Sequence, residues 1–538
     1  MLPRLVPALA QCALWLGCLG LGAAHAQAQR DVPAATGAGT SFAISGFSLQ
    51  GDVPLSGAET ARILAPFIGP HATLATLQQA SAALESAFKE RGFLLHRVSL
   101  PAQELGGPVT LDVVRFVIGK VSVSATVQHT PENIRASIPE LREGGTPNFR
   151  LLAVQTTLAN ENPSKQLQVT VKESEDEPDK IDANVQVKEA SPWNGSVSMN
   201  NSGTDATGND RFTVSLGYAN AWSLDHQVSL AYTTSLEKPD QVSQTGFNYR
   251  IPLYSAGAVL GLSYTSSSVV GNFGGFSSTG AGQTYGLSYN DYGVPVTGFR
   301  SFWTYGLDYK VFNASQVNGS TIAGQVDRSS NPVSLGYNAR HESDTVVWSL
   351  NADVEANIPG SPGNDSASYQ SEDARISNVA FSVLHGGATL MKPLVKGWYF
   401  NLASHWQYTG DALISGEQFG LGGQSSVRGA AERAIAGDTG ATLSLELHSA
   451  DLHPGLHALA FVDSGWLGSN NTDASTSGMM ASNQLQGLGL GLRYVRPGWN
   501  VLLDWGHLVL GANQPPGGNT SLPRAGDERT NLSVTASF

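Results

Sequence analysis

The chain has 538 residues and a formal net charge of −13, from 31 lysine and arginine residues against 44 aspartate and glutamate residues. Charged residues make up only 14% of the sequence, and glycine is abundant at 60 residues, a composition typical of strands joined by polar loops. The acidic balance, without a cluster of lysine and arginine, argues against nucleic acid as the main partner.

Residues 1–26 have the pattern of a secretory signal peptide. A mostly apolar run, residues 5–23, is followed by Ala24 and Ala26, which place small residues at both key positions of a cleavage site. We expect cleavage after Ala26; a lipoprotein signal at Cys18 is the alternative, but the apolar run continues past that cysteine. The other cysteine, Cys12, also falls in this segment, so we expect no disulfide in the exported protein.

A short alanine- and glycine-rich segment, residues 27–40, follows the expected cleavage site. Nowhere later does the sequence approach the ~18 consecutive apolar residues that a membrane helix requires. An exported chain of this kind is either a soluble periplasmic protein or an outer-membrane barrel.

Residues 41–119 predict a small α/β module with the order β-α-α-β-β. Ser56 and Glu59 form a capping box at the start of a first helix. Thr73 begins a longer helix whose apolar residues recur at helical spacing, and Gly92 ends it. The strands that we expect in this module are residues 41–49, 93–100 and 109–117.

Residues 120–190 predict a second, looser copy of this module. Ile134, Ile138 and Leu141 indicate its first helix, and residues 151–158 indicate its second. The acidic residues 173–179 are interpreted as a solvated hairpin loop. The strands that we expect here are residues 120–127, 166–171 and 181–187.

From residue 193 to residue 538, segments of alternating apolar and polar residues predict about sixteen strands. Residues 211–218 show the pattern, since every second residue from Phe212 to Tyr218 is apolar and the residues between are small or polar. A soluble sheet wetted on one face gives the same alternation. Short and long loops also alternate along the chain, as they do in outer-membrane barrels.

Aromatic residues near the ends of these segments also fit the girdles at the two surfaces of a membrane. The residues concerned are Trp398, Tyr399, Trp406, Tyr408 and Trp499. The predicted fold class is therefore an all-β transmembrane barrel of about sixteen antiparallel strands, preceded by two small α/β modules.

Two motifs in the predicted barrel carry a resemblance to a known family. Val427, Arg428 and Gly429 resemble the tip of an external loop that folds back into the barrel lumen. Residues 461–465 resemble the Phe-x-Asp-x-Gly strand motif that receives this loop. Further matching stretches are residues 87–93, 97–103, 133–144 and 489–494, and the terminal Phe538.

On these residues the chain resembles the two-partner-secretion transporters, the haemolysin secretion/activation family. That family belongs to a wider superfamily of outer-membrane transport and assembly barrels. The resemblance implies two polypeptide-transport-associated (POTRA) domains, residues 41–119 and 120–190, ahead of a sixteen-stranded barrel. It also implies that Arg428 contacts Asp463, with Phe461 and Gly465 as part of the receiving strand.

A guanidinium–carboxylate contact is geometrically specific yet only weakly stabilising when it is solvated, which suits a loop that has to be released. Gly429 lets the loop tip turn sharply. Taken without the surrounding motifs, Arg428 would more simply be a solvated loop arginine and Asp463 a carboxylate of the lumen.

Three features depart from the family pattern. Ala430 stands where an aromatic residue usually follows Val-Arg-Gly, which predicts a more mobile loop tip. Residues 114–119 lack the glutamate that often ends the first POTRA domain. Residues 27–40 are too few for the plug helix and linker of many members, so we expect the inward loop to do most of the gating.

The function implied is the secretion of one large partner protein, such as a haemolysin, an adhesin or a contact-dependent toxin, from the periplasm to the cell surface. We expect no cofactor, no nucleotide hydrolysis and no metal. The POTRA domains would lie in the periplasm and capture the partner by strand addition. The residues that we predict for this surface are Thr73, Leu77, Phe93, Leu95 and Arg97.

The expected partners are the secreted protein, outer-membrane lipid and the barrel assembly machinery, which would recognise Phe538 at the end of the chain. Three other functions remain open. An assembly factor of the same superfamily would insert other barrels, a porin would pass solutes, and an adhesin would use the long external loops.

An enzyme is not indicated, because G-x-S-x-G, H-E-x-x-H and P-loop motifs are missing from the sequence. His448, His453 and His457 lie close in sequence without cysteine partners, and a metal site there is a remote alternative. Since His448 and Glu446 share a strand face, both are interpreted as polar residues that line the lumen.

Overall fold

The computed structural model describes residues 41–104, 107–177, 179–273, 275–278, 280–314, 316–317, 320–472, 480–514 and 521–538. The expected signal peptide and the segment 27–40 lie outside these residues. The described chain forms two compact units, one with the two α/β modules and one with the barrel. No helix among the described residues is long and apolar enough to cross a membrane.

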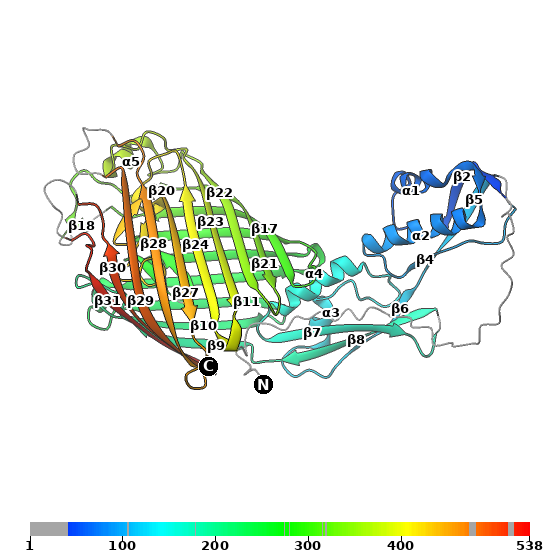
Figure 1. Cartoon of the computed structure of the whole chain (residues 1–538), viewed down its shortest axis with the longest axis horizontal. Helices are drawn as coiled ribbons and strands as arrows, with labels where there is room; N and C mark the ends of the chain where they lie inside the picture. Colours follow the sequence, from blue (N-terminus) through cyan, green and yellow to red (C-terminus); the bar gives the residue numbers. More distant parts are fainter. Residues whose placement is uncertain are drawn as a thin grey trace. The chain divides into compact units, whose positions relative to one another are not determined.

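The first module is a three-stranded sheet covered by helices (Figure 1). The sheet has the order β2-β5-β4, with β2 parallel to β5 and β4 antiparallel to it. Its elements are β1 (Phe42–Ile44), β2 (Gly46–Gly51), α1 (Gly57–Leu64), the 3-10 turn η1 (Ala65–Phe67), β3 (Gly69–Ala72), α2 (Leu74–Glu90), β4 (His96–Ser99) and β5 (Pro108–Arg115).

Helical periodicity builds the core of this module. Leu77, Leu84 and Phe88 of α2 are fully buried, together with Leu111 of β5. The predicted helix starts are confirmed, because the Ser56 side chain accepts the Glu59 N–H, and Thr73 and Thr76 complete a capping box. Each cap satisfies amide groups that the first turn of a helix leaves free.

The strand expected at residues 93–100 is shorter than predicted and begins at His96. The chain leaves α2 through Gly92, whose φ of +95° lies in the left-handed region. The Phe93 N–H then donates to the Phe88 carbonyl over 2.8 Å. Residues 93–95 are used to reverse the chain from the helix back to the sheet, so Phe93 and Leu95 are not strand residues.

The second module has a sheet of order β6-β8-β7. Its first strand begins at Val117, before the predicted start at residue 120, and its first helix ends at Ala136, so Ile138 and Leu141 follow that helix. Of the acidic stretch 173–179, Glu173 ends β7 and pairs with Ile181 of β8, so Glu175, Asp176 and Glu177 lie in the connection of a hairpin, as predicted. The elements are β6 (Val117–Val123), α3 (Pro131–Ala136), α4 (Phe149–Asn160), β7 (Lys165–Glu173) and β8 (Lys180–Glu189).

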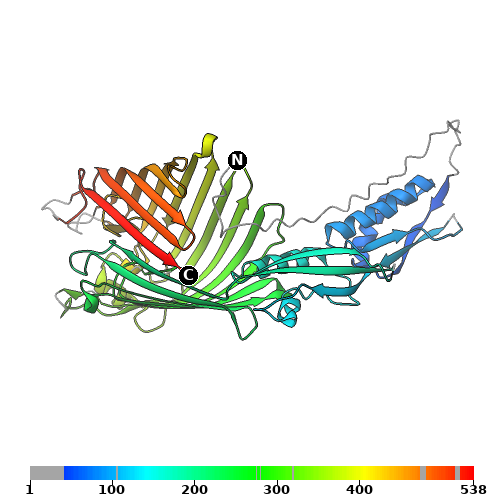
Figure 2. The same cartoon turned by 90° about the horizontal axis from the view of Figure 1, so that it is seen from below.

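The second unit is a closed antiparallel barrel whose strands follow one another round the wall in chain order (Figures 1 and 2). It closes where β31 pairs with β9, for example Ala536 with Val197. Because β20 and β21 both pair with β17 and are separated only by Asn331, they count as one strand, and the barrel has sixteen. The predicted fold class is confirmed.

The barrel strands are β9 (Trp193–Asn200), β10 (Arg211–Ala221), β11 (His226–Thr234), β12 (Ser243–Leu253), β13 (Ala258–Ser267), β16 (Gly282–Tyr292), β17 (Phe299–Phe312), β20 (Arg328–Ser330), β21 (Pro332–Glu342), β22 (Val347–Asn357), β23 (Ser382–Pro393), β24 (Tyr399–Tyr408), β27 (Thr439–His448), β28 (Leu456–Gly468), β29 (Ser482–Arg496), β30 (Trp499–Leu510) and β31 (Glu528–Ser537).

The loops and turns of the barrel carry the remaining short elements. These are β14 (Gly271–Phe273), β15 (Phe276–Ser278), β18 (Gln316–Val317), β19 (Ser320–Thr321), β25 (Phe419–Leu421), β26 (Ile435–Gly437), α5 (Ser366–Glu372) and the 3-10 turns η2 (Pro239–Gln241), η3 (Tyr254–Ala256), η4 (Val395–Gly397) and η5 (Ser415–Glu417).

Alternating residues of each barrel strand face opposite sides of the wall. On β10, Val214 and Leu216 are 42% and 46% exposed on the outer face. Thr213 points inward, where its hydroxyl lies 2.6 Å from that of Thr233 on the neighbouring strand. An apolar outer face around a polar interior is the arrangement that a bilayer demands of a closed sheet.

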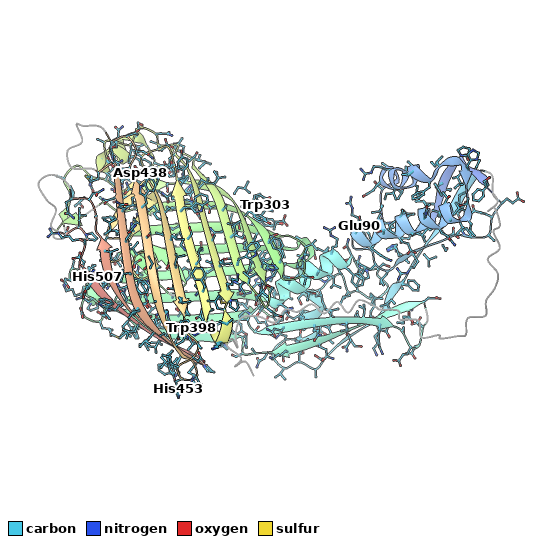
Figure 3. The ribbon with its side chains drawn as sticks, in the orientation of Figure 1. Glu90, Trp303, Trp398, Asp438, His453 and His507 are labelled. Carbon is cyan, nitrogen blue, oxygen red and sulfur yellow. The ribbon has the colours of Figure 1, made fainter. Side chains whose placement is uncertain are left out.

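Successive barrel strands run in opposite directions, so the short turns and the long loops lie at opposite ends of the barrel. Figure 3 shows Asp438, which ends one long loop, at one end, and His453, in a turn between β27 and β28, at the other. One aromatic residue departs from the predicted girdle. The Tyr399 hydroxyl lies 3.0 Å from His457 Nε2, and its ring stacks on that of His448 inside the lumen.

Candidate functional site in the barrel lumen

The loop between β24 and β27, residues 409–438, folds back into the barrel and is called the lumen loop here. Its first and last parts pair as β25 and β26, so the tip between them is a closed hairpin. Val427 and Arg428 at the tip are 0% and 3% exposed. The next residue, Gly429, has a φ of +108°, a conformation that favours glycine and turns the tip.

Arg428 is held by a two-pronged contact with Asp463 of β28. Its Nε and Nη2 atoms each donate to a different carboxylate oxygen over 2.7 Å, and its backbone N–H donates to Oδ2 over 3.1 Å. The side chains of Arg428 and Asp463 are 4% and 0% exposed. We call this pair the tip anchor. Parallel N–H···O bonds of this kind fix both position and orientation.

Three further side chains of the lumen wall surround the tip anchor. Arg428 Nη1 donates to Glu446 over 2.6 Å, and Nη2 donates to the Ser444 hydroxyl over 3.1 Å. The Ser444 hydroxyl in turn donates to Asp463 over 2.7 Å. The guanidinium also lies 3.4 Å from the centroid of the Phe461 ring, a cation–π contact. The carboxylates of Asp463 and Glu446 therefore share the buried guanidinium of Arg428.

Glycines make room for the loop tip on the neighbouring strands. A Cβ atom at Gly487 of β29 would lie 2.4 Å from the Arg428 carbonyl oxygen, and one at Gly506 of β30 would lie 2.7 Å from the Gly429 nitrogen. At Gly465 of β28, it would lie 2.7 Å from a Leu421 methyl. Larger residues at these positions would push the loop backbone off the wall.

An apolar cluster seats the hairpin beside the polar contact. Val427 and Ala430 pack with Leu421 of the loop and with Leu485 and Leu508 of the wall, all of them at most 3% exposed. Ala430, where the sequence predicted a more mobile tip, is therefore enclosed. Compared with an aromatic residue at this position, the Ala430 side chain offers less contact area, but it fits between the loop tip and the barrel wall.

The structure thus brings together all six residues that the sequence analysis singled out for the lumen. Val427, Arg428 and Gly429 form the tip, and Phe461, Asp463 and Gly465 form the strand surface beneath it. The sequence analysis missed Ser444 as a partner, and it placed Glu446 on the lumen face without connecting it to Arg428. Both lie on β27, at a distance in sequence that no local pattern bridges.

A second group that sequence reasoning missed joins the lumen loop to the long loop containing α5. Asp438, which is fully buried, accepts from Arg375 Nη1 over 3.0 Å, from the Leu413 N–H over 2.9 Å and from the Asn470 N–H over 2.8 Å. Asp373 also contacts Arg375, over 2.7 Å. Three long loops meet at this carboxylate.

In the first module, one residue of the predicted partner-binding surface is not available. Leu77 is 0% exposed because it belongs to the core of α2, so it cannot contact a partner. Thr73 caps that helix, whereas Phe93 and Leu95 are half-buried and Arg97 is exposed. The strand β4 does lie at an edge of its sheet, but the Glu85 carboxylate accepts its Val98 N–H over 2.8 Å.

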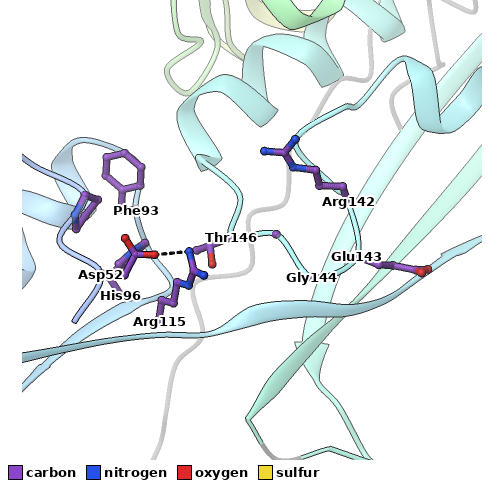
Figure 4. A pocket seen from close by; sticks show the side chains of 10 residues that line it. Asp52, Phe93, His96, Arg115, Arg142, Glu143, Gly144 and Thr146 are labelled. Atoms are coloured by element: carbon purple, nitrogen blue, oxygen red, sulfur yellow. Dashed lines mark ion pairs between the residues drawn. The ribbon is translucent and has the colours of Figure 1, made fainter.

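A groove of about 540 Å³ lies where the two modules meet (Figure 4). Phe93 and His96 line one side, next to the ion pair of Asp52 and Arg115, and Arg142 lies on the other side. Burial is the main cause that lowers the pKa of His96. The nearby Asp52 opposes this shift, and Arg115 adds to it.

The chain ends in the barrel wall. The Phe538 N–H donates to the Gly195 carbonyl, the Gly195 N–H donates to the Phe538 carbonyl, and both bonds measure 3.0 Å. The Phe538 ring covers Gly195, because a Cβ atom added at Gly195 would lie 2.6 Å from this ring. Phe538 itself is 77% exposed. The terminal ring therefore lies on the outer face of the closing strand pair.

Comparison with known proteins decides the family. The sequence model for "Haemolysin secretion/activation protein ShlB/FhaC/HecB" matches residues 179–494, and the model for the ShlB-type POTRA domain matches residues 42–115. The chain belongs to the haemolysin secretion/activation protein family. It is an outer-membrane transporter of the two-partner-secretion type, and the role of translocase for a partner exoprotein fits both the family and the fold.

Curated relatives of this transporter include outer membrane transporter CdiB of Escherichia coli, 25% identical over 465 residues that cover 83% of this chain and 76% of that protein. CdiB of Dickeya dadantii is 26% identical over 403 residues, which cover 72% and 69%. Among solved structures, CdiB from Escherichia coli superposes with a TM-score of 0.71 at 21% identity, covering 95% of this chain and 93% of that chain.

The same fold is shared with CdiB from Acinetobacter baumannii, with a TM-score of 0.68 at 17% identity, covering 93% of this chain and 90% of that one. Both structural likenesses extend over the modules and the barrel together, since they leave out little of the chain. They establish the architecture of the transporter.

His448 and His457 of the transporter make polar contacts with other side chains of the lumen. His448 Nε2 lies 2.9 Å from Glu446, and the His448 and His457 ring centroids are 5.4 Å apart. In the described part of the chain, Asp353, Glu355 and His385 could approach one ion together. However, Glu355 already contacts the Lys310 ammonium over 3.0 Å, and His385 Nδ1 lies 3.0 Å from Asp353.

Proposed function

We propose that this transporter exports one large partner protein by releasing its lumen loop from the barrel wall. The observation that carries the proposal is the tip anchor, a single arginine that holds an inward loop against a wall shaped to receive it. The partner would be an exoprotein of the haemolysin, adhesin or contact-dependent toxin kind. It would cross unfolded and fold outside, so that no nucleotide and no catalytic residue takes part.

Because the tip anchor is buried, its release costs least when both charged side chains become hydrated together. Removing only one partner would leave a charge buried without compensation, which typically costs about 3–5 kcal/mol. When the whole loop leaves, Arg428 and Asp463 are both hydrated, so the cost is much smaller. A polypeptide entering the lumen would bring water and backbone groups that replace these contacts.

Partner capture is assigned to the first module, facing the periplasm. The edge strand β4 would accept a partner strand, with Thr73, Phe93, Leu95 and Arg97 around it. Because Glu85 already occupies the Val98 N–H, a partner strand would have to displace that carboxylate. Glu85→Ala should therefore tighten partner binding measured with the purified transporter, whereas Glu90→Ala on the same helix should leave it unchanged. Weaker or equal binding for Glu85→Ala would place capture elsewhere.

Insertion into the outer membrane is assigned to the barrel assembly machinery, acting on the end of β31. Deletion of Phe538 should reduce the amount of heat-modifiable barrel in the outer membrane, because an exposed terminal aromatic is the group that this machinery would recognise. Phe538→Tyr, which keeps an aromatic ring, serves as the control. Normal insertion without Phe538 would exclude this role.

The test of transport is a comparison of culture supernatant and outer membrane with and without the gene. Loss of one large protein from the supernatant, with an unchanged membrane, is expected, and the wild-type gene should restore it whereas Arg428→Ala should not. Depletion of several barrels from the membrane would instead indicate an assembly factor. No change in either fraction would favour a porin or an adhesin.

A further inference from the structure

The lumen loop makes a second ionic contact with the wall, at its base and away from the tip anchor. Glu417, in the turn η5, accepts from Lys310 Nζ of β17 over 3.0 Å through Oε2. Its other oxygen accepts from the Ser330 hydroxyl of β20 over 2.6 Å. Its backbone carbonyl accepts from Gln407 Nε2 over 2.9 Å. We call the contact between Lys310 and Glu417 the base anchor.

The base anchor is buried, and its ammonium lies between two carboxylates. The Lys310 side chain is 18% exposed and the Glu417 side chain is 8% exposed. Lys310 Nζ also contacts Glu355 of β22 over 3.0 Å, and this side chain is 10% exposed. One ammonium thus holds two carboxylates together. Without it, the loop carboxylate would face a wall carboxylate in a poorly hydrated place, and like charges there repel strongly.

The two anchors use different parts of the wall. The base anchor involves β17, β20 and β22, whereas the tip anchor involves β27 and β28, and the strands β23 and β24 separate these groups in the barrel. Within the loop, Arg433 donates to the Ser415 and Gln418 carbonyls over 2.7 and 2.8 Å. These bonds tie the returning chain to η5, so the base can move as one unit.

We propose that Lys310 is a positioning residue for transport, which fastens the base of the lumen loop through Glu417, and that this fastening has to release separately from the tip anchor before a partner can cross. Freeing Arg428 alone would let the tip move while the base still narrows the lumen. Freeing both contacts opens the full width. The inference rests on the proposed function, and its first test needs no partner protein.

The first test is the conductance of the purified full-length transporter in planar lipid bilayers. Lys310→Met should raise the resting conductance or the frequency of open events several-fold over wild type. Lys310→Arg should restore the wild-type value because it keeps the charge. Glu355→Gln is the matched control, since it removes a wall carboxylate but leaves the base anchor in place, and it should conduct like wild type.

Conductance of Lys310→Met equal to wild type would overturn the proposal. Equal heat-modifiable mobility of all variants shows that the barrel has formed. Combining Lys310→Met with Arg428→Ala should raise conductance by more than the two single effects added together. A double variant no more conductive than Arg428→Ala alone would mean that the base never holds the loop by itself.

The second test locks the base reversibly. Cys12 and Cys18 are the only native cysteines, so Ser330→Cys with Glu417→Cys can be bridged by a short bis-methanethiosulfonate reagent that reductant removes. Bridged protein should secrete no partner, and reductant should restore secretion. Thr213→Cys with Thr233→Cys, which bridges two wall strands whose hydroxyls lie 2.6 Å apart, is the control and should secrete with the bridge in place.

Normal secretion by the bridged Ser330→Cys, Glu417→Cys protein would show that the base stays on the wall, which overturns the inference but not the transport function. If the wild-type protein itself secretes no partner, the proposed function fails, while the conductance comparison still decides whether Lys310 holds the loop.

Discussion

The α/β modules and the barrel use the same alternation of side chains in opposite senses. In the first module, Leu84 of α2 is 0% exposed and packs against a sheet. In the barrel, Leu490 of β29 is 61% exposed on the outer face, while Asp463 of β28 is fully buried inside. The modules exclude water from an apolar core, whereas the barrel directs its apolar residues at lipid and its charges at each other.

This difference teaches that burial has a different meaning in each region. In the modules a buried residue is stabilised by transfer of apolar surface out of water. In the barrel many of the buried residues are polar, and where they are charged, as Arg428 and Asp463 are, a single substitution leaves an unpaired charge. The same change at two sites therefore tests different physical effects.

The largest effect is expected for Leu84→Lys. An ammonium in the apolar core of the first module has no partner, and isolated charges are the most costly groups to bury. The module should unfold, so that fast hydrogen exchange appears along α2 in the full-length protein while the barrel keeps its heat-modifiable mobility. Gln79→Lys, on the exposed face of the same helix, should leave exchange unchanged.

The second largest effect is expected for Arg428→Ala. Asp463 and Glu446 would lose their shared cation, a loss of about 3–5 kcal/mol for a buried pair, and the loop tip would leave the wall. We expect secretion to fall strongly while the barrel still inserts. Arg250→Ala is the control, because Arg250 Nη2 donates to the Tyr292 hydroxyl over 2.9 Å and joins two wall strands that take no part in the tip anchor. Loss of secretion in both variants would remove the special role of Arg428.

Leu490→Lys should have a smaller effect than Leu84→Lys, although it is the same change. A lysine on the lipid face costs about 2–4 kcal/mol at the midplane of the membrane, and less near its surfaces, where the side chain reaches water. The measurement is the urea midpoint of the barrel refolded into lipid vesicles. Leu490→Val should match wild type. A midpoint for Leu490→Lys equal to wild type would mean that this face does not meet lipid.

The smallest effect concerns pH in the first module. Burial keeps the pKa of His96 below its usual value of 6.5. As the pH falls below 6.5, the unfolded chain takes up the proton before the folded module does, so the module loses stability. Hydrogen exchange along α2, corrected for its intrinsic pH dependence, should rise at pH 5 relative to pH 7. His96→Phe should reduce this rise, and an equal rise in both proteins would exclude His96 as its cause.

Much of the fold was predictable because its signals are local. Ser56, Thr73 and Gly92 mark helix ends through their own caps and backbone angles, and the alternation of apolar and polar residues marked the barrel strands. The errors concern residues whose burial or orientation depends on the side chains packed around them in the folded protein. Leu77 was assigned to a binding surface although its helical spacing places it in the core. Tyr399 was assigned to the outer girdle although its strand register turns it inward.

The sequence by itself determined the two modules, the barrel, the family resemblance and the six residues of the lumen motif, because each depends on short patterns or on residue identity. Only the tertiary structure decided what holds the lumen loop. Glu417 meets Lys310, Asp438 meets Arg375 and the loop tip meets Gly487 and Gly506 across large separations in the chain. Such contacts depend on how sixteen strands close around the loop, which no local pattern encodes.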